Sequence, residues 1–422
     1  MATAGRMSRT VVIGAGVIGL ACAYELQRRG ERVTILDRGE PGAGCSSGNS
    51  GWIVPALSGP VPAPGLLGTS LRWLLKADSP LYIRPRADLQ FLGWLWDFRR
   101  HCTAPAHRAG LEAVAALNAR TMELYDALEK DGVQIEMHRQ GVLLAFLGRS
   151  ALDHIARDLE RMRAFGCAEP VRLTAREVRE VEPLLGPSVV GGILAEGERH
   201  VRPETLTAGL LRRVREGGAE IRTGVEVSGL RRRGRAVAAV ETAEGVLEAD
   251  RVVIAAGAWS GVLASRVGYR LPIQAGKGYS ITLTRPSASV RRPLYLDEAR
   301  IAVSNFDGAL RLGGTMELSG LDPALDMRRI EAIRRGADRY LLGWGRGERE
   351  VAWAGMRPLT PDGLPVIGSV PGVEGLYIAT GHGMLGVTLA PATASALAEL
   401  VTTGRSSVSL SAFDPGRFAR RR

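Results

Sequence analysis

The sequence has few cysteines. Its 422 residues include only Cys22, Cys45, Cys102 and Cys167. No two of these are spaced as a CxxC pair, so neither a cysteine metal site nor a disulfide framework is predicted. A chain of this length with so little cysteine is typical of a reduced compartment. We therefore expect a cytoplasmic protein that contains no metal.

The chain is also short of lysine and aromatic residues, although it is strongly basic. Only three of its 55 basic residues are lysines, and the net charge of +11 is carried by scattered arginines. The basic runs 231–233 and 420–422 have a single aromatic neighbour, Phe418. A nucleic-acid surface combines clustered positive charge with aromatic side chains on which bases stack. Nucleic acid is therefore not an expected partner.

No apolar run is long enough to cross a membrane. The first apolar segment, VVIGAGVIGLACAYEL, follows two arginines and superficially resembles a signal peptide. Its regularly spaced glycines have a better explanation. Residues 10–38 follow the order strand, glycine turn, helix, strand and acid, which is typical of a dinucleotide-binding unit. Its candidate cofactor contacts are Gly14, Gly16, Val17, Ile18, Gly19, Asp37 and Arg38.

A second small-residue loop, PGAGCSSGNSGWIVP at residues 41–55, follows the acid almost at once. A nicotinamide dehydrogenase would normally continue into another crossover helix here. A loop rich in glycine and serine instead lets the backbone lie against a long cofactor, which favours FAD. The candidate contacts in this loop are Gly44, Cys45, Ser46, Ser47, Asn49, Ser50, Gly51 and Trp52.

Residues 203–260 predict a second Rossmann-like element. A helix that starts at Pro203 and stops at a glycine is followed by a strand. LEADRVVIAAGAWS then predicts a strand that ends in a small-residue turn able to approach a cofactor. The candidate contacts are Val225, whose backbone would meet adenine, and Ala256, Gly257 and Trp259.

With these segments in place, the chain resembles the FAD-dependent D-amino-acid oxidase superfamily, and most of all its bacterial D-amino-acid dehydrogenases. The resemblance is carried by GAGVIG (14–19), GCSSGNSGW (44–52), ADRVVIAAGAWS (249–260), GKGYSIT (276–282), GMRPLTPDGLPVIG (355–368) and YIATGHGMLGVTLAPATA (377–394). Relatives with covalent flavin use a C-terminal cysteine or a histidine near the second glycine loop. The chain has no cysteine after Cys167 and no histidine before residue 101, so the resemblance implies noncovalent FAD.

The resemblance also implies the substrate site. The arginine of the GMRPLTPDG pattern, Arg357, is expected to bind the substrate carboxylate through its planar, bidentate fork. A structural alternative pairs Arg357 with Asp362 in its own loop. Tyr279 is expected to reach the same carboxylate, although a strand tyrosine is commonly part of a core. Lys277 either orders the loop or is simply exposed.

The C-terminal segment 375–400 predicts a strand, a glycine loop and a helix from about Leu385. The helix N-terminus is expected to face the N1–C2=O edge of the flavin, where partial positive charge favours reduction. The candidate donors are Gly383, Met384, Leu385, Gly386 and Thr388. His382 is expected to satisfy backbone groups rather than to act as a base.

The segment 65–102 carries Trp73, Trp94 and Trp96 among leucines and arginines. Two interpretations remain open, a helix at a membrane interface or a helical pair packed in the substrate domain. Because D-amino-acid dehydrogenases pass electrons to the respiratory chain, the resemblance favours a quinone or other acceptor and peripheral contact with the inner face of the cytoplasmic membrane. Direct use of oxygen stays open.

We therefore predict an α/β protein in which a Rossmann-like FAD domain of the glutathione-reductase type is interleaved with an α+β substrate domain. The FAD domain takes residues 1–57, 186–268 and 352–422. The substrate domain takes 58–185 and 269–351 and contains a mainly antiparallel sheet.

The predicted reaction is oxidative deamination of D-amino acids to 2-oxo acids and ammonia. Small or apolar substrates are expected, because no carboxylate is foreseen for a cationic side chain. The alternatives are an oxidase of glycine, sarcosine or D-proline, a tRNA-modifying flavoenzyme and a noncatalytic flavoprotein.

Overall fold

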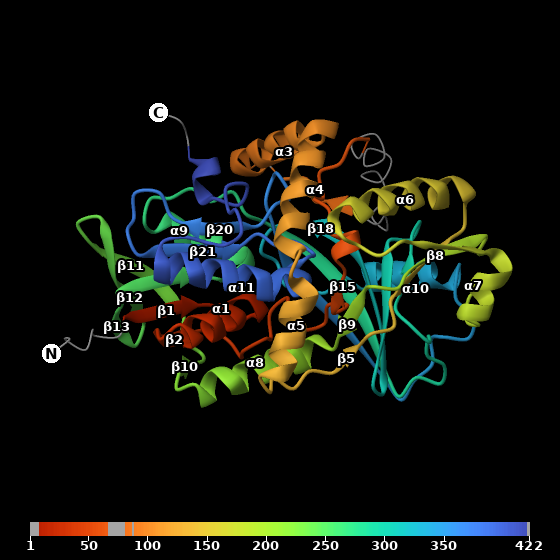
Figure 1. Ribbon diagram of the computed structural model, residues 1–422, viewed down its shortest axis with the longest axis horizontal. Helices are drawn as coiled ribbons and strands as arrows, with labels where there is room; N and C mark the ends of the chain where they lie inside the picture. The colour runs from red at the N-terminus through yellow and green to blue at the C-terminus, as the bar shows by residue number, and fades with distance from the viewer. Residues whose placement is uncertain (1–7, 66–80, 87, 420–422) are drawn as a thin grey trace.

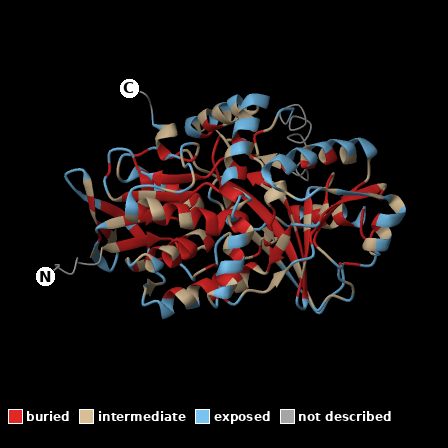
Figure 2. Cartoon of the chain, in the orientation of Figure 1, coloured by how far each residue is buried: buried red, intermediate tan, exposed pale blue. Residues whose placement is uncertain are grey.

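The computed structural model describes residues 8–65, 81–86 and 88–419. Two large sheets lie side by side along the long axis of the molecule, with helices packed around them (Figure 1). Buried residues concentrate in the strands of both sheets and on the inner sides of the helices (Figure 2). The cavity described below lies where the two sheets meet.

The first sheet is the one that the nucleotide motif predicts. Its strand order is β10-β2-β1-β14-β21-β20, and every pairing is parallel except that of β20 with β21. The strands are β10 (Glu220–Arg222), β2 (Arg32–Leu36), β1 (Arg9–Ile13), β14 (Arg251–Ile254), β21 (Leu376–Thr380) and β20 (Val366–Ser369).

Both faces of this sheet are covered, which explains its runs of β-branched residues. Val12 faces a core built with helices α1, α8 and α11, while its neighbours Val11 and Ile13 face a second core built with the meander β11-β12-β13. The helices are α1 (Val17–Arg28), α8 (Pro203–Glu216) and α11 (Gly386–Thr403). The meander strands are β11 (Val227–Arg233), β12 (Ala236–Thr242) and β13 (Gly245–Glu248).

The second sheet has nine strands and is mainly antiparallel, as predicted. Its order is β19-β15-β18-β17-β16-β6-β8-β7, and β4 lies beside β18; only β16–β6 and β18–β4 pair in parallel. The strands are β19 (Arg349–Leu359), β15 (Gln274–Thr284), β18 (Ala309–Leu318), β17 (Ile301–Phe306), β16 (Leu294–Leu296), β6 (Val142–Phe146), β8 (Gly191–Ala195), β7 (Val171–Thr174) and β4 (Leu81–Ile83). Helix α10 (Met327–Asp338) packs on one face.

The two sheets draw their strands alternately from the chain, so the predicted interleaving is present. Three details differ from the predicted boundaries. Strand β19 belongs to the nine-stranded sheet, although 352–422 was predicted for the FAD domain. Strand β8 belongs to the nine-stranded sheet, although 186–268 was predicted for the FAD domain. Helices α4 (Ala104–Asn118) and α5 (Thr121–Lys130) share a core with α1 and α11, although they were predicted in the substrate domain. The division into domains remains a proposal.

The remaining elements connect these layers. A small sheet β3-β9-β5 joins the second glycine loop to the nine-stranded sheet through Trp52, whose Nε1 donates to Ser304 Oγ at 2.9 Å. Its strands are β3 (Trp52–Ile53), β9 (Arg199–Val201) and β5 (Met137–His138). The peripheral helices are α3 (Leu89–His101), α6 (Arg149–Met162), α7 (Ala175–Val181) and α9 (Ser260–Ser265), and the 3-10 turns are η1 (Pro55–Leu57), η2 (Arg163–Phe165), η3 (Gly257–Trp259) and η4 (Pro415–Phe418).

Strand β4 and helix α3 are the described elements of the segment 65–102, and Trp73 lies outside the described residues. Asp88 caps the helix by accepting from the N–H groups of Gln90 and Phe91. Trp94 is buried and donates its Nε1 to Pro272 O at 3.1 Å. The opposite side of α3 exposes its apolar residues to solvent. Among the described helices, none is both long and apolar enough to span a membrane.

Candidate active site

One large cavity of about 1690 Å³ lies between the two sheets. Its wall is formed by the turn after β1, the second glycine loop, the turn after β14, strand β19 and the N-terminus of α11. Ligands of open α/β sheets bind at the carboxyl ends of the strands, which is where this cavity lies. All predicted cofactor residues line it except Gly19, Ser47 and Thr388.

The first glycine turn admits no side chain at two positions. A Cβ on Gly14, whose φ is +108°, would lie 2.5 Å from Ala255 O. A Cβ on Gly19 would lie 1.9 Å from Gly14 O, so this glycine serves the packing of α1 on the turn rather than the cavity. The backbone of the turn is thereby exposed to a ligand at the start of α1, where helix N–H groups favour an anion.

The acid that ends β2 holds this turn. Asp37 Oδ2 accepts from Ala15 N at 2.7 Å, and Oδ1 accepts from Gly39 N at 2.9 Å. Carboxylate oxygens keep further acceptor capacity, so ribose hydroxyls remain suitable donors to it. Beside it, the Arg38 guanidinium lies 4.0 Å over the Trp259 ring. Val225 donates its N–H to Asp37 O at 2.9 Å, which leaves only its carbonyl for adenine.

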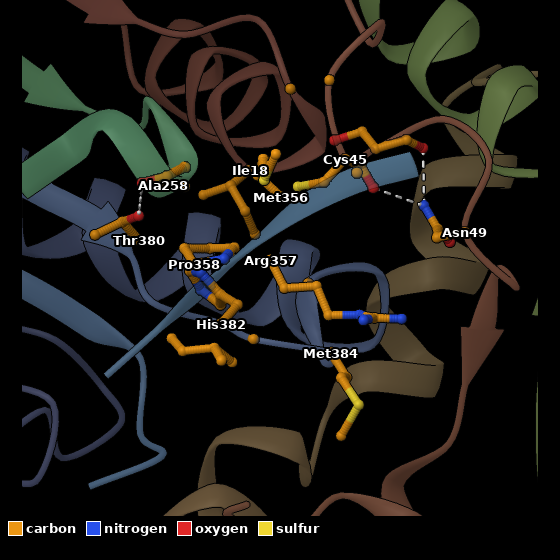
Figure 3. A pocket seen from close by; sticks show the side chains of 18 of the residues that line it. Ile18, Cys45, Asn49, Ala258, Met356, Arg357, Pro358, Thr380, His382 and Met384 are labelled. Carbon is orange, nitrogen blue, oxygen red and sulfur yellow. Dashed lines mark hydrogen bonds between the residues drawn. The ribbon is translucent and has the colours of Figure 1, made fainter. Parts of the chain in front are cut away.

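The second glycine loop is shaped mainly by its own polar side chains. Asn49 donates to the carbonyls of Cys45 and Ser46 at 3.2 and 2.9 Å (Figure 3) and accepts from Gly51 N at 2.8 Å. The prediction that Asn49 and Ser47 bind pyrophosphate or ribityl oxygens is therefore not supported, since Ser47 Oγ also donates within the loop. Ser46 Oγ accepts from Val17 N at 2.9 Å and so lies directly at the α1 terminus.

An arginine that the sequence reasoning missed fastens this loop to β18. Arg311 is buried and donates to Asn49 O at 2.9 Å, to Glu204 Oε1 at 2.7 Å and to Thr282 Oγ1 at 2.9 Å. Glu204 in turn accepts from Gly48 N at 3.3 Å. These partners come from segments far apart in the sequence, so no local pattern identifies them.

The N-terminus of α11 faces the cavity through a glycine turn. Gly383 adopts a φ of +55° and donates its N–H to Pro358 O, and Leu385 N donates to His382 O. In the described chain the N–H groups of Met384 and Gly386 donate to no protein acceptor, so they are the donors available to a ligand.

The side chains of Thr388 and His382 form hydrogen bonds within the protein instead of pointing to a ligand. Thr388 Oγ1 donates to Trp52 O at 3.0 Å and accepts from Val54 N at 3.2 Å, so it fastens α11 to β3. The hydroxyl is therefore engaged by the backbone around β3, and its contact with flavin stays a prediction. His382 Nε2 contacts Thr393 Oγ1 at 3.0 Å, and burial lowers the pKa of His382 to about 3. The imidazole is neutral at ordinary pH.

Arg357 extends from β19 into the cavity (Figure 3). Its Nη1 donates to Thr315 O at 3.1 Å, and within the described residues no carboxylate pairs with it. Desolvation lowers the pKa of Arg357 to about 10, which still leaves it charged. The alternative pairing with Asp362 is excluded, because Asp362 Oδ2 lies 2.7 Å from Arg417 Nε.

Tyr279 lines the same cavity as Arg357, but its hydroxyl does not point toward the Arg357 guanidinium. Successive side chains of a strand point to opposite faces. Arg357 pairs with Gly276 and its side chain lies against Gly278, so Tyr279 points to the other face of the sheet. There its hydroxyl donates to Glu317 Oε2 at 2.7 Å inside the core that contains α10.

Lys277 shares the face that carries Tyr279 and is almost completely buried. Its Nζ donates to Ala324 O at 3.0 Å and lies 3.5 Å from Glu317 Oε1. Of the two interpretations, the ordering role fits, because the amine ties β15 to the segment after β18.

The remaining wall includes groups that were not predicted to contact a ligand. Trp94, Phe98 and Leu318 form an apolar side. Elsewhere the wall carries Asp297, whose Oδ1 lies 3.2 Å from Arg300 Nη1. Burial raises the pKa of Asp297, so this carboxylate is costly to leave unpaired. Because Asp297 already has a cationic partner in Arg300, it is not a carboxylate dedicated to a cationic substrate side chain, and the preference for small or apolar substrates stays a prediction.

The cavity fits a dinucleotide whose pyrophosphate lies at the turn before α1 and whose other end carries negative charge near α11. Backbone is exposed at the glycine turn before α1, an acid stands beside it, and unoccupied N–H groups lie at the α11 terminus. These are the contacts expected for pyrophosphate, ribose and the electron-rich edge of a reduced flavin.

Comparison with known proteins agrees with this reading of the site. The family model for FAD dependent oxidoreductases (DAO) matches residues 9–400. A D-amino acid dehydrogenase from Cereibacter sphaeroides is 37% identical over 402 residues, which cover 93% of this chain and 91% of that protein. A D-amino acid dehydrogenase from a Methylobacterium species is 33% identical over 421 residues, which cover 98% and 99%.

Among solved structures, glycine oxidase from Geobacillus kaustophilus superposes with a TM-score of 0.76 over 97% of this chain and 99% of that one, at 24% identity. That similarity concerns the fold. Together with the family match over nearly the whole length, it accounts for both sheets and for the cavity between them. The chain belongs to the DAO family of FAD-dependent oxidoreductases.

Proposed function

We propose that the protein is an FAD-dependent D-amino-acid dehydrogenase that converts a D-amino acid to the 2-oxo acid and ammonia. The relatives that cover almost all of the chain carry this activity in their names. The observation that supports it most directly is Arg357, a desolvated guanidinium that points into the cavity with no carboxylate partner in the described chain. A buried arginine in this state favours an anionic ligand.

The residues of the chain mainly bind and orient the substrate. Arg357 would hold the α-carboxylate by two parallel hydrogen bonds, which fixes the position of Cα. The apolar side of the wall, with Trp94, Phe98 and Leu318, would exclude water and accommodate the side chain. We assign no residue to deprotonation of the amine, because His382 is neutral and buried against Thr393.

FAD, when bound noncovalently in the cavity, supplies the acceptor for the hydride that leaves Cα. The free N–H groups of Met384 and Gly386 at the α11 terminus would stabilise negative charge at that end of the site. The turn before α1 would hold the pyrophosphate at the other end. Water then hydrolyses the released imine.

The decisive experiment is anaerobic addition of amino acids to the purified yellow protein. We expect bleaching of the flavin absorbance by small or apolar D-amino acids, including D-proline, and much slower bleaching by L-amino acids and by D-arginine. Bleaching by glycine or sarcosine alone would instead indicate an amine oxidase. Absence of bleaching by all of these would contradict the proposal.

We further propose that a quinone or another membrane acceptor takes the electrons at a surface near α3. One side of this helix lines the cavity through Trp94, while Leu89, Leu92 and Trp96 are 86, 51 and 58% exposed on the other. The Arg99 guanidinium lies 5.5 Å over the Trp96 ring. Exposed tryptophan and leucine beside arginine suit the interface of an anionic membrane.

A further inference from the structure

Strand β18 contains a bulge beside Arg357. Glu317 pairs with Lys277 of β15, but the next pair is Gly314 with Tyr279. Thr315 and Met316 therefore lie opposite the single residue Gly278. Such an insertion disrupts the ladder and redirects the backbone groups of the bulged strand.

Thr315 has two unusual features. Its φ is +57°, a conformation that a β-branched residue rarely adopts. Its Oγ1 is also buried without a hydrogen-bond partner in the part of the chain that the structure describes. Strained backbone and unsatisfied polar groups persist where the surrounding structure holds them for a function. Thr315 lines the cavity, so we expect its unusual conformation to serve the site in that cavity.

The bulge directs two adjacent carbonyl groups to two arginines. Thr315 O accepts from Arg357 Nη1 at 3.1 Å, and Met316 O accepts from Arg329 Nη2 at 3.1 Å. Arg329 is a residue of α10, 1% exposed. Because α10 packs on the face that carries Tyr279, Arg329 approaches the bulge from the side opposite to Arg357.

Gly278 provides the surface on which the guanidinium rests. A Cβ on Gly278 would lie 2.0 Å from Arg357 Nη1, 2.1 Å from Cζ and 2.2 Å from Nη2. The planar group therefore lies directly against the Cα of Gly278. No side chain fits at this position unless the guanidinium moves.

We propose that the Thr315–Met316 bulge and Gly278 are the positioning elements of Arg357. This inference rests on the proposed role of Arg357 as the carboxylate ligand. The bond to Thr315 O occupies one of the five guanidinium N–H donors, orients the plane and leaves four for the substrate. In a regular ladder Thr315 O would be committed to a neighbouring strand. Small displacements of a bound substrate slow a reaction strongly. Because Thr315 O and Gly278 fix the position of Arg357, they also fix the position of the substrate and thereby affect the rate of flavin reduction.

The test is a double-mutant cycle of Gly278→Ala and Arg357→Ala in the FAD-loaded protein. The measurements are the anaerobic rate of flavin reduction by one D-amino acid and the Kd of benzoate from the change in flavin absorbance. Gly276→Ala is the matched control. It lies two residues away on the same face, and its Cβ would meet Leu359 Cδ1 at 2.5 Å instead of the guanidinium.

We expect Gly278→Ala to slow reduction and to weaken benzoate by at least about 10-fold, as for loss of a hydrogen bond to a charged group, while FAD content stays at that of the wild type. In the Arg357→Ala background the same substitution should change the rate by less than about 2-fold, because nothing is left to displace. Gly276→Ala should have the same effect in both backgrounds.

Equal effects of Gly278→Ala in the two backgrounds would overturn the positioning role. If Arg357→Ala alone leaves reduction and benzoate binding intact, the role of Arg357 as carboxylate ligand fails instead, whatever Gly278 does, while absence of reduction of the wild-type flavin by any D-amino acid would contradict the proposed function itself. Thr315→Gly offers a second variant that relieves strain, because glycine adopts a φ near +57° freely. We expect this variant to weaken the binding of benzoate, because the carbonyl of residue 315 is then held less firmly, while Tm stays the same or rises. A loss of Tm with unchanged benzoate affinity would assign the bulge a purely structural role.

Discussion

At the scale of single residues, the site depends on a cation whose partner the described chain does not supply. Arg417 takes the nearby carboxylate of Asp362, and the bulge supplies only a carbonyl to Arg357. A guanidinium in this state is stabilised when an anion binds, and the gain is largest for an anion that matches its planar fork.

Substitution of Arg357 should therefore separate substrate binding from cofactor binding. Arg357→Lys keeps the charge but loses the fork, so kcat/KM should fall about 10- to 100-fold, and Arg357→Ala should lose more. FAD content and the flavin spectrum should stay near those of the wild type. Steady-state kinetics and absorbance spectra check this.

Arg417→Met is the matched control for the same loop. It should lower Tm by removing the partner of Asp362 while the benzoate Kd remains that of the wild type. If Arg357→Ala behaves like this control, with lower Tm and unchanged benzoate binding, Arg357 is a brace rather than a ligand.

At the scale of elements, local motifs predicted what local forces determine. The β1 turn, α1, β2, α8 and α11 lie within a few residues of their predicted positions, because glycine spacing, apolar periodicity and Pro203 act over short distances. The face of the sheet to which a side chain points is not determined by such local forces. Tyr279 faces away from Arg357 because β18 and β19 fix the register of β15.

The same distinction applies to two polar residues that were predicted to bind the cofactor. Thr388 and Asn49 have the chemistry of cofactor ligands, but their partners, Trp52 O and the loop carbonyls, depend on how α11 and the second loop pack. Asp297 and Trp94 reach the cavity from segments that carry no recognised motif. Such contacts follow from tertiary packing, which a single sequence does not display.

Helix α3 gives a prediction about the membrane. The double variant Leu92→Glu/Trp96→Glu should reduce cosedimentation with phosphatidylglycerol vesicles by at least about 10-fold, because it removes exposed apolar surface and adds negative charge. Anaerobic reduction by the D-amino acid should be unchanged, since neither side chain lines the cavity.

Val246→Glu, an exposed apolar position in β13, controls for added charge alone. Membrane contact through α3 would be refuted if the wild-type protein did not cosediment with the vesicles. It would also be refuted if the double variant cosedimented as well as Val246→Glu.

At the scale of the whole molecule, buried titratable groups make stability depend on pH in two directions. Desolvation lowers the pKa of His382 to about 3 and of His200 to about 4 from 6.5. The unfolded chain therefore binds more protons than the folded one below pH 6.5, and stability falls on acidification through that window. Burial raises the pKa of Glu198 from 4.5 to about 8. The folded state then holds the extra proton, and stability falls as pH rises from 4.5 through 8.

Glu198→Gln should remove the second effect. The N–H of Ala56 donates to Glu198 Oε1 at 3.1 Å, and a glutamine oxygen can accept the same hydrogen bond. Glutamine also has no charge to bury. The gain in Tm over wild type should be small at pH 5 and should grow to roughly a few degrees at pH 8. Thermal unfolding monitored by circular dichroism across this range measures it. Glu196→Gln, an exposed neighbour, should show no such trend; a gain that is independent of pH would contradict the assignment to Glu198.

The order of strands in the first sheet has a consequence for synthesis. Strand β1 is synthesised about 240 residues before its neighbour β14, and β21, the next strand of the sheet, follows later still. The wall that would hold FAD includes the first turn and the start of α11, so a nascent chain has no complete cofactor site until α11 has been synthesised. Pairing over such separations is slow, and unpaired edges of parallel strands are prone to aggregation. We therefore expect a chain cut before α11 to lack part of the FAD site, and FAD to bind only after α11 has been synthesised.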